Sequence, residues 1–277
     1  MYTERAAART LRGRLLRWYA REGRRLPWRA TRDPYAILVS EVMLQQTQVA
    51  RVLPAYAAFL RRFPTLRALA RATLADVLRA WSGLGYNRRA RDLHRIARLY
   101  SAALPTAASA LDELPGVGAY TAGAVACFST GARVAFADTN IRRVLGRVVL
   151  GRVATEREAV AIDTELMPAG AAAWHHALMD LGATVCLSRV PRCDICPVAE
   201  VCRGRGRVVP AKGRAQAPFA TSDRRIRGRI VARLRVRTTT IQALRRELRD
   251  TRVERLVRDL EQEGLVERHG SRVSLPV

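Results

Sequence analysis

The stretch that decides the fold is residues 114–140, LPGVGAYTAGAVACFSTGARVAFADTN. Its first five residues lie between two segments with helical apolar periodicity, so the sequence predicts a tight turn that joins two helices. Glycine permits positive φ, and successive N–H groups can then point outward above the second helix, where the helix dipole favours an anion such as phosphate. The expected phosphate-binding residues of this turn are Leu114, Gly116, Val117 and Gly118.

An acidic residue follows this turn a short distance farther along the chain. Asp138 stands beside Asn140, at the start of a further helical pattern over residues 141–149. An acid close to an anion-binding turn predicts a DNA-backbone contact next to a catalytic group. Asp138 can also cap the helix that it precedes, and one residue can fill both roles.

Composition points to a polyanionic partner. The 277 residues include 49 basic and 24 acidic side chains, which give a formal net charge of +25, and 49% of the residues are hydrophobic, as in a folded protein. The positive charge is spread along the chain, which favours nucleic acid as the partner. A GC-rich genome favours arginine codons, which explains part of the excess of basic residues. The positive charge is present whatever its origin. Lys212 is the only lysine.

Hydropathy gives no sign of a membrane segment. The sequence has no run of eighteen apolar residues, and the first twenty residues are charged throughout, without the apolar core of a signal peptide. We therefore expect a soluble cytoplasmic protein that does not associate with a membrane.

Four of the five cysteines crowd into a short segment with the spacing C-x6-C-x2-C-x5-C: Cys186, Cys193, Cys196 and Cys202. This pattern favours a metal site in a reducing compartment over a set of disulfides. A tetrahedral zinc site and an iron–sulfur cubane both take four cysteines, and the spacing leaves both open. Cys127 stands apart and is expected to be a small buried hydrophobic residue.

The first two hundred residues have helical periodicity and no convincing alternating strand, so the sequence predicts an all-α domain with short connections. Glu41 lies in the expected second helix among apolar neighbours. A carboxyl group in such surroundings has a raised pKa, as a general acid requires, whereas a solvated surface glutamate is the ordinary alternative. The expected helices span residues 3–21, 34–47, 49–63, 74–80, 88–103, 141–149, 156–167 and 171–182.

A second, smaller unit follows a linker. Residues 206–222 lack periodicity and are rich in glycine, proline, arginine and alanine. Beyond them, the pattern predicts helices over residues 223–234, 239–248 and 251–262, and then a hairpin over residues 265–275. Three helices and a hairpin predict a winged-helix-like module over residues 223–277. Such modules bind DNA or dock onto proteins.

Five motifs together resemble one family. SEVMLQQTQV at 40–49, GLGY at 83–86, LPGVGAYTAGAV at 114–125, the segment 138–140 and the four-cysteine pattern have the order and intervals of the helix-hairpin-helix DNA glycosylases related to endonuclease III. The resemblance covers about residues 8–205 and is strongest to the A/G-specific adenine glycosylases. LPGVG alone would be far less specific.

The resemblance implies a two-lobed helix-hairpin-helix fold with a [4Fe–4S] cluster on the four cysteines. The catalytic domain would span residues 1–205, with a six-helix lobe at about 29–140 and a cluster lobe made of 1–28 and 141–205. It also implies a base-excision-repair enzyme that hydrolyses the N-glycosidic bond of adenine mispaired with 8-oxoguanine or guanine. The adenine would be flipped out of the duplex first, because its bond cannot be reached within the stack.

The resemblance also implies roles for four residues. Glu41 would protonate the departing adenine, and Asp138, supported by Asn140, would stabilise the oxocarbenium-like sugar. Tyr120 stands where several adenine glycosylases have a catalytic tyrosine and lyase-type relatives have a lysine. A Schiff-base lyase needs a primary amine, and Lys212 is remote from this motif, so a monofunctional glycosylase is expected.

Three further residues are implied to contact DNA. Arg29 matches a residue near the adenine, while Gln46 and Tyr86 match residues that wedge into the helix beside the mispaired base. Each has a structural alternative: Arg29 as one surface arginine among many, and Tyr86 as a helix contact after the Gly-Leu-Gly turn. The implied partner is double-stranded DNA with A·8-oxoguanine or A·G mispairs, bound by a monomer associated with the bacterial nucleoid.

The sequence departs from the family at two places. His175 and His176 replace a polar amide or acid pair, and the C-terminal module replaces the Nudix-like domain of many adenine glycosylases. Two rival functions also stay open. A mismatch thymine glycosylase shares the fold, the cluster and the tyrosine, and a non-enzymatic iron–sulfur DNA-binding regulator would share the cluster and the winged helix.

Overall fold

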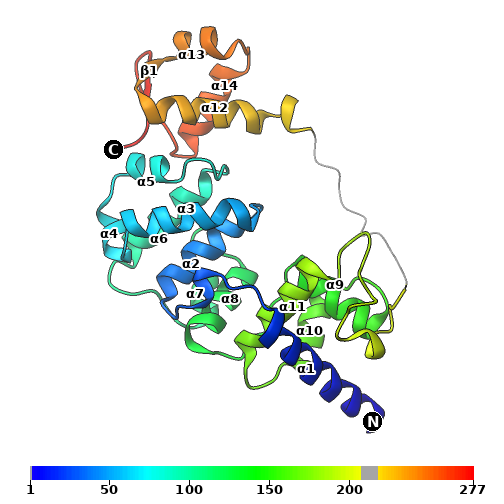
Figure 1. Cartoon of the computed structure of the whole chain (residues 1–277). Coiled ribbons are helices and arrows are strands. Elements are labelled where there is room, and N and C mark those ends of the chain that lie inside the picture. The colour runs from blue at the N-terminus through cyan, green and yellow to red at the C-terminus, as the bar shows by residue number, and fades with distance from the viewer. Residues whose placement is uncertain (1, 207–217) are drawn as a thin grey trace. The chain divides into compact units, whose positions relative to one another are not determined.

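The computed structural model describes residues 2–206 and 218–277, and most of its regular structure is helical (Figure 1). The chain divides into two compact units. The first unit comprises Met1–Ile37, Thr106–Glu113 and Val117–Gly213, and the second comprises Leu38–Pro105, Leu114–Gly116 and Arg214–Val277. Among the described helices, none has the length and apolar content that crossing a membrane would require.

The first unit packs its helices around one apolar core. Helix α1 presents Leu15 to α11, where Trp174 and Leu181 are also fully buried. These side chains recur at helical spacing, which gives each helix one apolar face. The elements are α1 (Tyr2–Glu22), η1 (Pro27–Arg29), α7 (Ala108–Asp112), α8 (Ala119–Thr130), α9 (Thr139–Leu145), the π-helical turn η2 (Gly146–Leu150), α10 (Glu156–Leu166), α11 (Ala171–Thr184) and η3 (Ala199–Val201).

The second unit contains a helical part and the C-terminal module. Helix α2 (Pro34–Leu44) begins in the first unit and ends in the second. Phe59 and Trp81 are fully buried, with their rings edge to face at a centroid distance of 5.8 Å. The other helices of the helical part of the second unit are α3 (Val49–Arg62), α4 (Leu66–Arg71), α5 (Leu74–Ala80) and α6 (Arg88–Leu99).

The C-terminal module combines three helices with a small sheet. Its elements are α12 (Asp223–Val236), β1 (Thr239–Thr240), α13 (Ile241–Leu248), α14 (Val253–Gln262), β2 (Glu267–His269) and β3 (Arg272–Ser274). The short helical turn η4 (Phe219–Thr221) precedes the module and lies in the expected linker. The strand order is β1-β3-β2, and both pairings are antiparallel. The expected hairpin is therefore confirmed. Most of the expected linker, residues 207–217, lies outside the described residues.

The expected helices differ from the observed ones at a few ends. The helix expected over 239–248 begins at Ile241, because Thr239 and Thr240 pair with Val273 and Arg272 of β3. The helix expected over 88–103 ends at Leu99. The short helix α4 was not expected, since one or two turns give too few residues for a periodic pattern.

Candidate active site

Asp138 is held by the helix that it caps. Its Oδ1 accepts hydrogen bonds from the backbone N–H groups of Asn140, at 2.9 Å, and Ile141, at 2.7 Å. Its Oδ2 accepts a hydrogen bond from the Asn140 side-chain Nδ2 at 2.8 Å. Three N–H donors suit a negatively charged carboxylate, and the cap at the start of α9 fixes where that charge lies.

Arg143 connects this cluster to the cysteine segment. Its Nη2 donates to Asn140 Oδ1 at 2.7 Å and to the Gly182 carbonyl at 2.6 Å, and its Nε donates to the Cys186 carbonyl at 2.7 Å. Gly182 has no room for a side chain, because a Cβ there would lie 2.6 Å from the Asn140 Cβ. These contacts fix the orientation of Asn140, whose amide nitrogen then points at Asp138.

Glu41 lies on α2, in the part of the helix that belongs to the second unit. Only 4% of its surface is exposed, and the neighbouring Leu38, Val39 and Met43 are fully buried. The solvated surface glutamate considered as an alternative is therefore wrong. A buried carboxyl group on an apolar helix is suited to holding and delivering a proton.

Arg89 holds two loops of the second unit in place from within the fold. Its side chain donates to six acceptors: the carbonyls of Val42 (2.8 Å), Met43 (2.9 Å), Gln45 (2.6 Å), Leu84 (3.0 Å) and Gly85 (3.2 Å) and the hydroxyl of Thr47 (3.1 Å). Burial lowers its pKa to about 10. The end of α2 and the Gly-Leu-Gly turn are thus tied to one guanidinium group.

Both predicted wedge residues lie on these two loops. Gln46 has a φ of 57° and Tyr86 a φ of 46°, a left-handed conformation that non-glycine residues seldom adopt. Both side chains are exposed, Tyr86 to 40%. Backbone strain of this kind concentrates at functional sites, where the surroundings must hold it. Arg89 supplies that support, because it binds the carbonyls of Gln45 and Gly85.

The predicted turn joins α7 and α8, which pack against each other (Figure 1). Gly116 has a φ of +72°, whereas Gly118 has a φ of −122° as the residue that precedes α8, so only Gly116 requires glycine for its conformation. The side chains of Leu114 and Val117 are buried. Contact with a phosphate would therefore fall to the backbone of the turn.

Tyr120 packs against Phe136, which in turn contacts a buried cluster of His175, Asp163 and Cys127. Its ring meets Phe136 edge to face at 5.5 Å, and Phe136 stacks on His175 at 4.0 Å. His175 Nε2 lies 2.7 Å from Asp163 Oδ2, and its Nδ1 lies 3.6 Å from the Cys127 Sγ. Burial raises the pKa of the Cys127 thiol to about 12. Cys127 is fully buried, as expected, and His175 belongs to the core.

Arg29 forms a buried ion pair. Its two terminal nitrogens donate to Asp180 at 2.8 Å each, and Arg24 Nε donates to the same carboxylate at 2.6 Å. Burial opposes the charge of Asp180, yet the two arginines hold the pKa of Asp180 below its ordinary value. Burial and the charge of Arg29 lower the pKa of nearby His176 to about 3, so His176 is neutral. Arg29 is thus not a free surface arginine.

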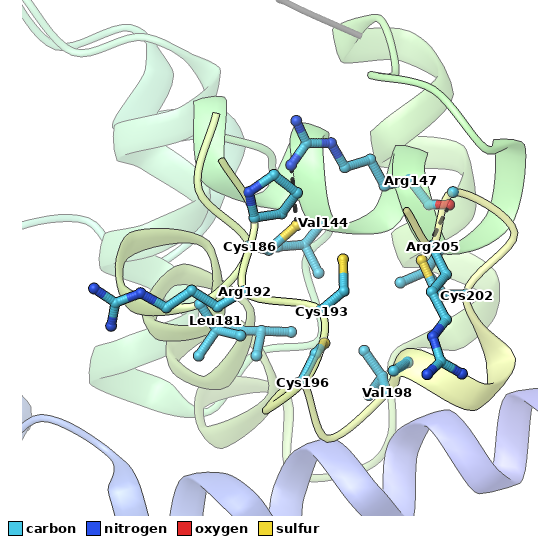
Figure 2. A pocket seen from close by; sticks show the side chains of 15 residues that line it. Val144, Arg147, Leu181, Cys186, Arg192, Cys193, Cys196, Val198, Cys202 and Arg205 are labelled. Carbon is cyan, nitrogen blue, oxygen red and sulfur yellow. Dashed lines mark hydrogen bonds between the residues drawn. The ribbon is translucent and has the colours of Figure 1, made fainter. Parts of the chain in front are cut away.

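The four clustered cysteines line one small cavity of about 20 Å³ in the first unit, which Figure 2 shows. None of them is in a disulfide. Arg147 Nη1 donates to Cys186 Sγ at 3.5 Å, and the Cys202 thiol donates to the Arg147 carbonyl at 3.6 Å. In the described part of the chain, no group of three or more histidine, cysteine, aspartate or glutamate side chains is arranged to hold a metal ion.

Sequence reasoning missed several residues that build these surroundings. Asp163 and Asp180 are acids on otherwise apolar helical faces, which is the same signal that singled out Glu41. Arg89 and Arg143 gave no signal, because nothing in the sequence distinguishes them from the other arginines.

The comparisons with known proteins identify the family and the fold. Residues 39–168 match the model of the HhH-GPD superfamily of base excision DNA repair proteins. A solved structure described as a thermostable thymine-DNA glycosylase aligns with a TM-score of 0.68 at 27% identity, over 73% of this chain and 98% of that chain. A non-covalent complex of endonuclease III with DNA aligns with a TM-score of 0.61 at 22% identity, which supports the fold.

Two curated relatives show to which branch of this superfamily the chain is similar. The adenine DNA glycosylase of Mycolicibacterium smegmatis is 45% identical over 240 residues, which are 82% of this chain and 81% of the relative. That of Homo sapiens is 40% identical over 229 residues, which are 75% of this chain and 42% of the longer human protein. The chain therefore belongs to the adenine DNA glycosylases, within the helix-hairpin-helix superfamily of base excision DNA repair proteins.

Proposed function

We propose that this protein releases adenine from duplex DNA in which the adenine is mispaired with 8-oxoguanine or guanine. The observation that carries the proposal is the carboxylate of Asp138, fixed by three N–H donors in a chain that belongs to the adenine DNA glycosylases. The net charge of +25 favours DNA as the partner. The protein is proposed to act as a monomer on DNA in the bacterial nucleoid.

In the proposed reaction, two carboxyl groups divide the chemistry. Buried Glu41 gives its proton to the departing adenine, so that a neutral base leaves. The Asp138 carboxylate, with Asn140 hydrogen-bonded to it, stabilises the positive charge that develops on the sugar as the glycosidic bond breaks. The oxygen of a water molecule then bonds to the sugar carbon, the proton that this water loses restores the Glu41 carboxylic acid, and an abasic site remains. Tyr120 is assigned to the same site as a further catalytic group.

DNA contacts are proposed for the backbone of the turn and for three side chains. Leu114, Gly116, Val117 and Gly118 would present N–H groups to a phosphate. Gln46 and Tyr86 would enter the helix beside the extruded base, since both are exposed on strained loops. Arg29 would lie near the adenine, where its pair with Asp180 orients it.

The protein is expected to release the base without cutting the strand. A lyase needs an amine that attacks the sugar, and Tyr120 stands where lyase-type relatives have a lysine. Incubation with an A·G duplex at neutral pH should therefore give full-length strands that break only after hot alkali. Trapping of a covalent protein–DNA complex by borohydride would contradict this expectation, and a lyase-type glycosylase on the same duplex serves as the positive control.

The four clustered cysteines are proposed as the ligands of a [4Fe–4S] cluster. All four residues line a single cavity, and Arg147 donates a hydrogen bond to the sulfur of Cys186, which suits a thiolate. A bound cluster would supply a rigid cross-link for residues 186–202. Hydrolysis of a glycosidic bond transfers no electrons, so no step of the reaction is assigned to the cluster. The cysteine segment would present Arg189 and Arg192, both exposed, to the DNA backbone.

Binding to DNA should weaken steeply with salt, and these two arginines should account for part of the slope. Replacing both Arg189 and Arg192 with alanine is expected to reduce the slope of log K against log salt by about 2, because each phosphate contact contributes roughly one unit. Anisotropy titrations from low to moderate salt measure the slope. An unchanged slope would remove the cysteine segment from the DNA-binding surface.

A thymine glycosylase is the second candidate, favoured by the likeness to the solved thymine-DNA glycosylase. The curated relatives at 40–46% identity, all named adenine DNA glycosylases, favour adenine over thymine. For the domain roles, we propose that residues 1–205 form the catalytic domain, residues 206–222 the linker and residues 223–277 the additional module.

A further inference from the structure

One aromatic side chain of the first unit, Phe136, is packed between other rings. Its ring meets Tyr120 and Phe128 of α8 edge to face, at centroid distances of 5.5 Å and 5.7 Å. It also stacks on the ring of His175 of α11 at 4.0 Å, with 21° between the two planes. Edge-to-face pairs are favoured because the electron-poor edge of one ring meets the electron-rich face of the other. Phe136 is therefore held on several sides by α8 and α11.

Gly123 of α8 makes room for this ring. A Cβ atom at Gly123 would lie 3.0 Å from both the Cβ and the Cδ1 of Phe136, closer than ordinary packing allows. Gly123 lies inside a regular helix, where glycine is less favourable than alanine. The close approach of Phe136, and not the backbone conformation, therefore accounts for a glycine at this position.

The ring of His175 is fixed in turn by a buried carboxylate. His175 Nε2 lies at hydrogen-bond distance, 2.7 Å, from Asp163 Oδ2, and the Trp174 Nε1 donates to Asp163 Oδ1 at 2.7 Å. All three side chains are fully buried. The hydrogen bond to Asp163 restricts rotation of the imidazole, so the plane on which Phe136 stacks is fixed as well. Close-packed interiors pass such constraints from one side chain to the next.

Phe136 lies next to two residues of the proposed reaction. Its ring contacts Tyr120, and Asp138 follows it two positions later in the chain. Tyr120 and Asp138 are partly exposed, whereas Phe136 is buried. The Asp138 carboxylate is held by its own hydrogen bonds to the start of α9. We therefore expect a displacement of Phe136 to move Tyr120 and to leave Asp138 in place.

We propose that Phe136 and His175 are positioning residues, which set where the hydroxyl group of Tyr120 lies in the active site. The inference rests on the proposed function, which assigns Tyr120 as a catalytic group. Phe136 is 2% exposed and His175 is fully buried, so both act through Tyr120 and not by touching the substrate. Precise placement matters, because a shift of about 1 Å in a reacting group can cost about 10²-fold in rate.

A double-mutant cycle on the full-length protein tests the proposal, with single-turnover release of adenine from an A·G duplex as the measurement. Phe136→Leu removes the central ring, and His175→Gln removes the stacked ring but keeps a donor for Asp163. Each should slow release about tenfold in the wild-type background, as should Tyr120→Phe. In the Tyr120→Phe background no hydroxyl group is left to misplace, so Phe136→Leu and His175→Gln should each slow release less than about twofold further.

Phe63→Leu is the matched control, because it removes an equally buried phenylalanine from the second unit. The folded Phe63→Leu protein should release adenine at the wild-type rate. If Phe136→Leu does not fold, Gly123→Ala takes its place, since it displaces the ring without removing it.

A merely structural role of Phe136 and His175 would slow release equally in both backgrounds, and that result overturns the proposal. The wild-type rate in Phe136→Leu or in Tyr120→Phe, or equal slowing by Phe63→Leu and Phe136→Leu, overturns it too. The proposed function fails separately: it is refuted if wild-type protein releases no adenine, whereas release by wild-type protein with equal slowing in both backgrounds refutes the positioning role alone.

Discussion

The Asp138→Asn protein is expected to bind mispaired duplex with unchanged affinity and to release adenine about 10²- to 10⁴-fold more slowly. Loss of the negative charge removes stabilisation that is needed only in the transition state. The fold should persist, because asparagine can still cap α9 by accepting from the N–H groups of Asn140 and Ile141. Single-turnover release of adenine and anisotropy binding measure the two effects separately.

Asp112→Asn provides the matched control for Asp138→Asn, since Asp112 is an exposed aspartate at the end of α7. Its rate should equal the wild-type rate. Glu41→Gln should behave like Asp138→Asn, because glutamine cannot deliver the proton. Adenine release at the wild-type rate by either Asp138→Asn or Glu41→Gln would contradict the assignment of that carboxyl group and would favour a non-enzymatic DNA-binding role.

Replacing Arg89 with methionine should lower the free energy of unfolding by about 3–5 kcal/mol. Methionine fills much of the same volume, but it leaves six acceptors without their donor. The melting temperature should fall by about 10 °C for a chain of this size. Folded Arg89→Met protein should also bind DNA less tightly, because Gln46 and Tyr86 lose the support for their strained backbone.

Arg95→Met controls for the loss of a charge from the same helix. Arg95 lies on α6 and is exposed. Its replacement should change stability by no more than about 0.5 kcal/mol, as is usual for surface substitutions. Equal melting temperatures for Arg89→Met and Arg95→Met would show that Arg89 does not hold the two loops.

Long amphipathic segments and turn residues made most of the helical fold predictable. Helix α5 has the expected bounds, 74–80, because Thr73 caps its start by accepting from the Asp76 N–H. The turn at 114–118 was predictable from its glycines and proline. Thr239 and Thr240 were placed in a helix because a two-residue strand depends on β3, more than thirty residues later in the chain, and no local pattern signals that pairing.

The candidate site was predictable only where a residue breaks a local pattern. Glu41 is an acid on an apolar helix, and Asp138 precedes a helix as a cap. The roles of Arg89 and Arg143 could not be predicted in this way, because they depend on carbonyl groups that folding brings together from distant segments. Arg89 binds carbonyls more than forty residues away in sequence, and Arg143 binds the Gly182 and Cys186 carbonyls.

The most direct test of the central claim compares two mispairs in otherwise identical duplexes. One duplex carries adenine opposite 8-oxoguanine, and the other carries thymine opposite guanine. Free base is measured by chromatography under single-turnover conditions with wild-type protein, and Asp138→Asn serves as the inactive control. We expect adenine to be released and thymine to stay attached; release of thymine without adenine would contradict the claim that this protein is an adenine glycosylase.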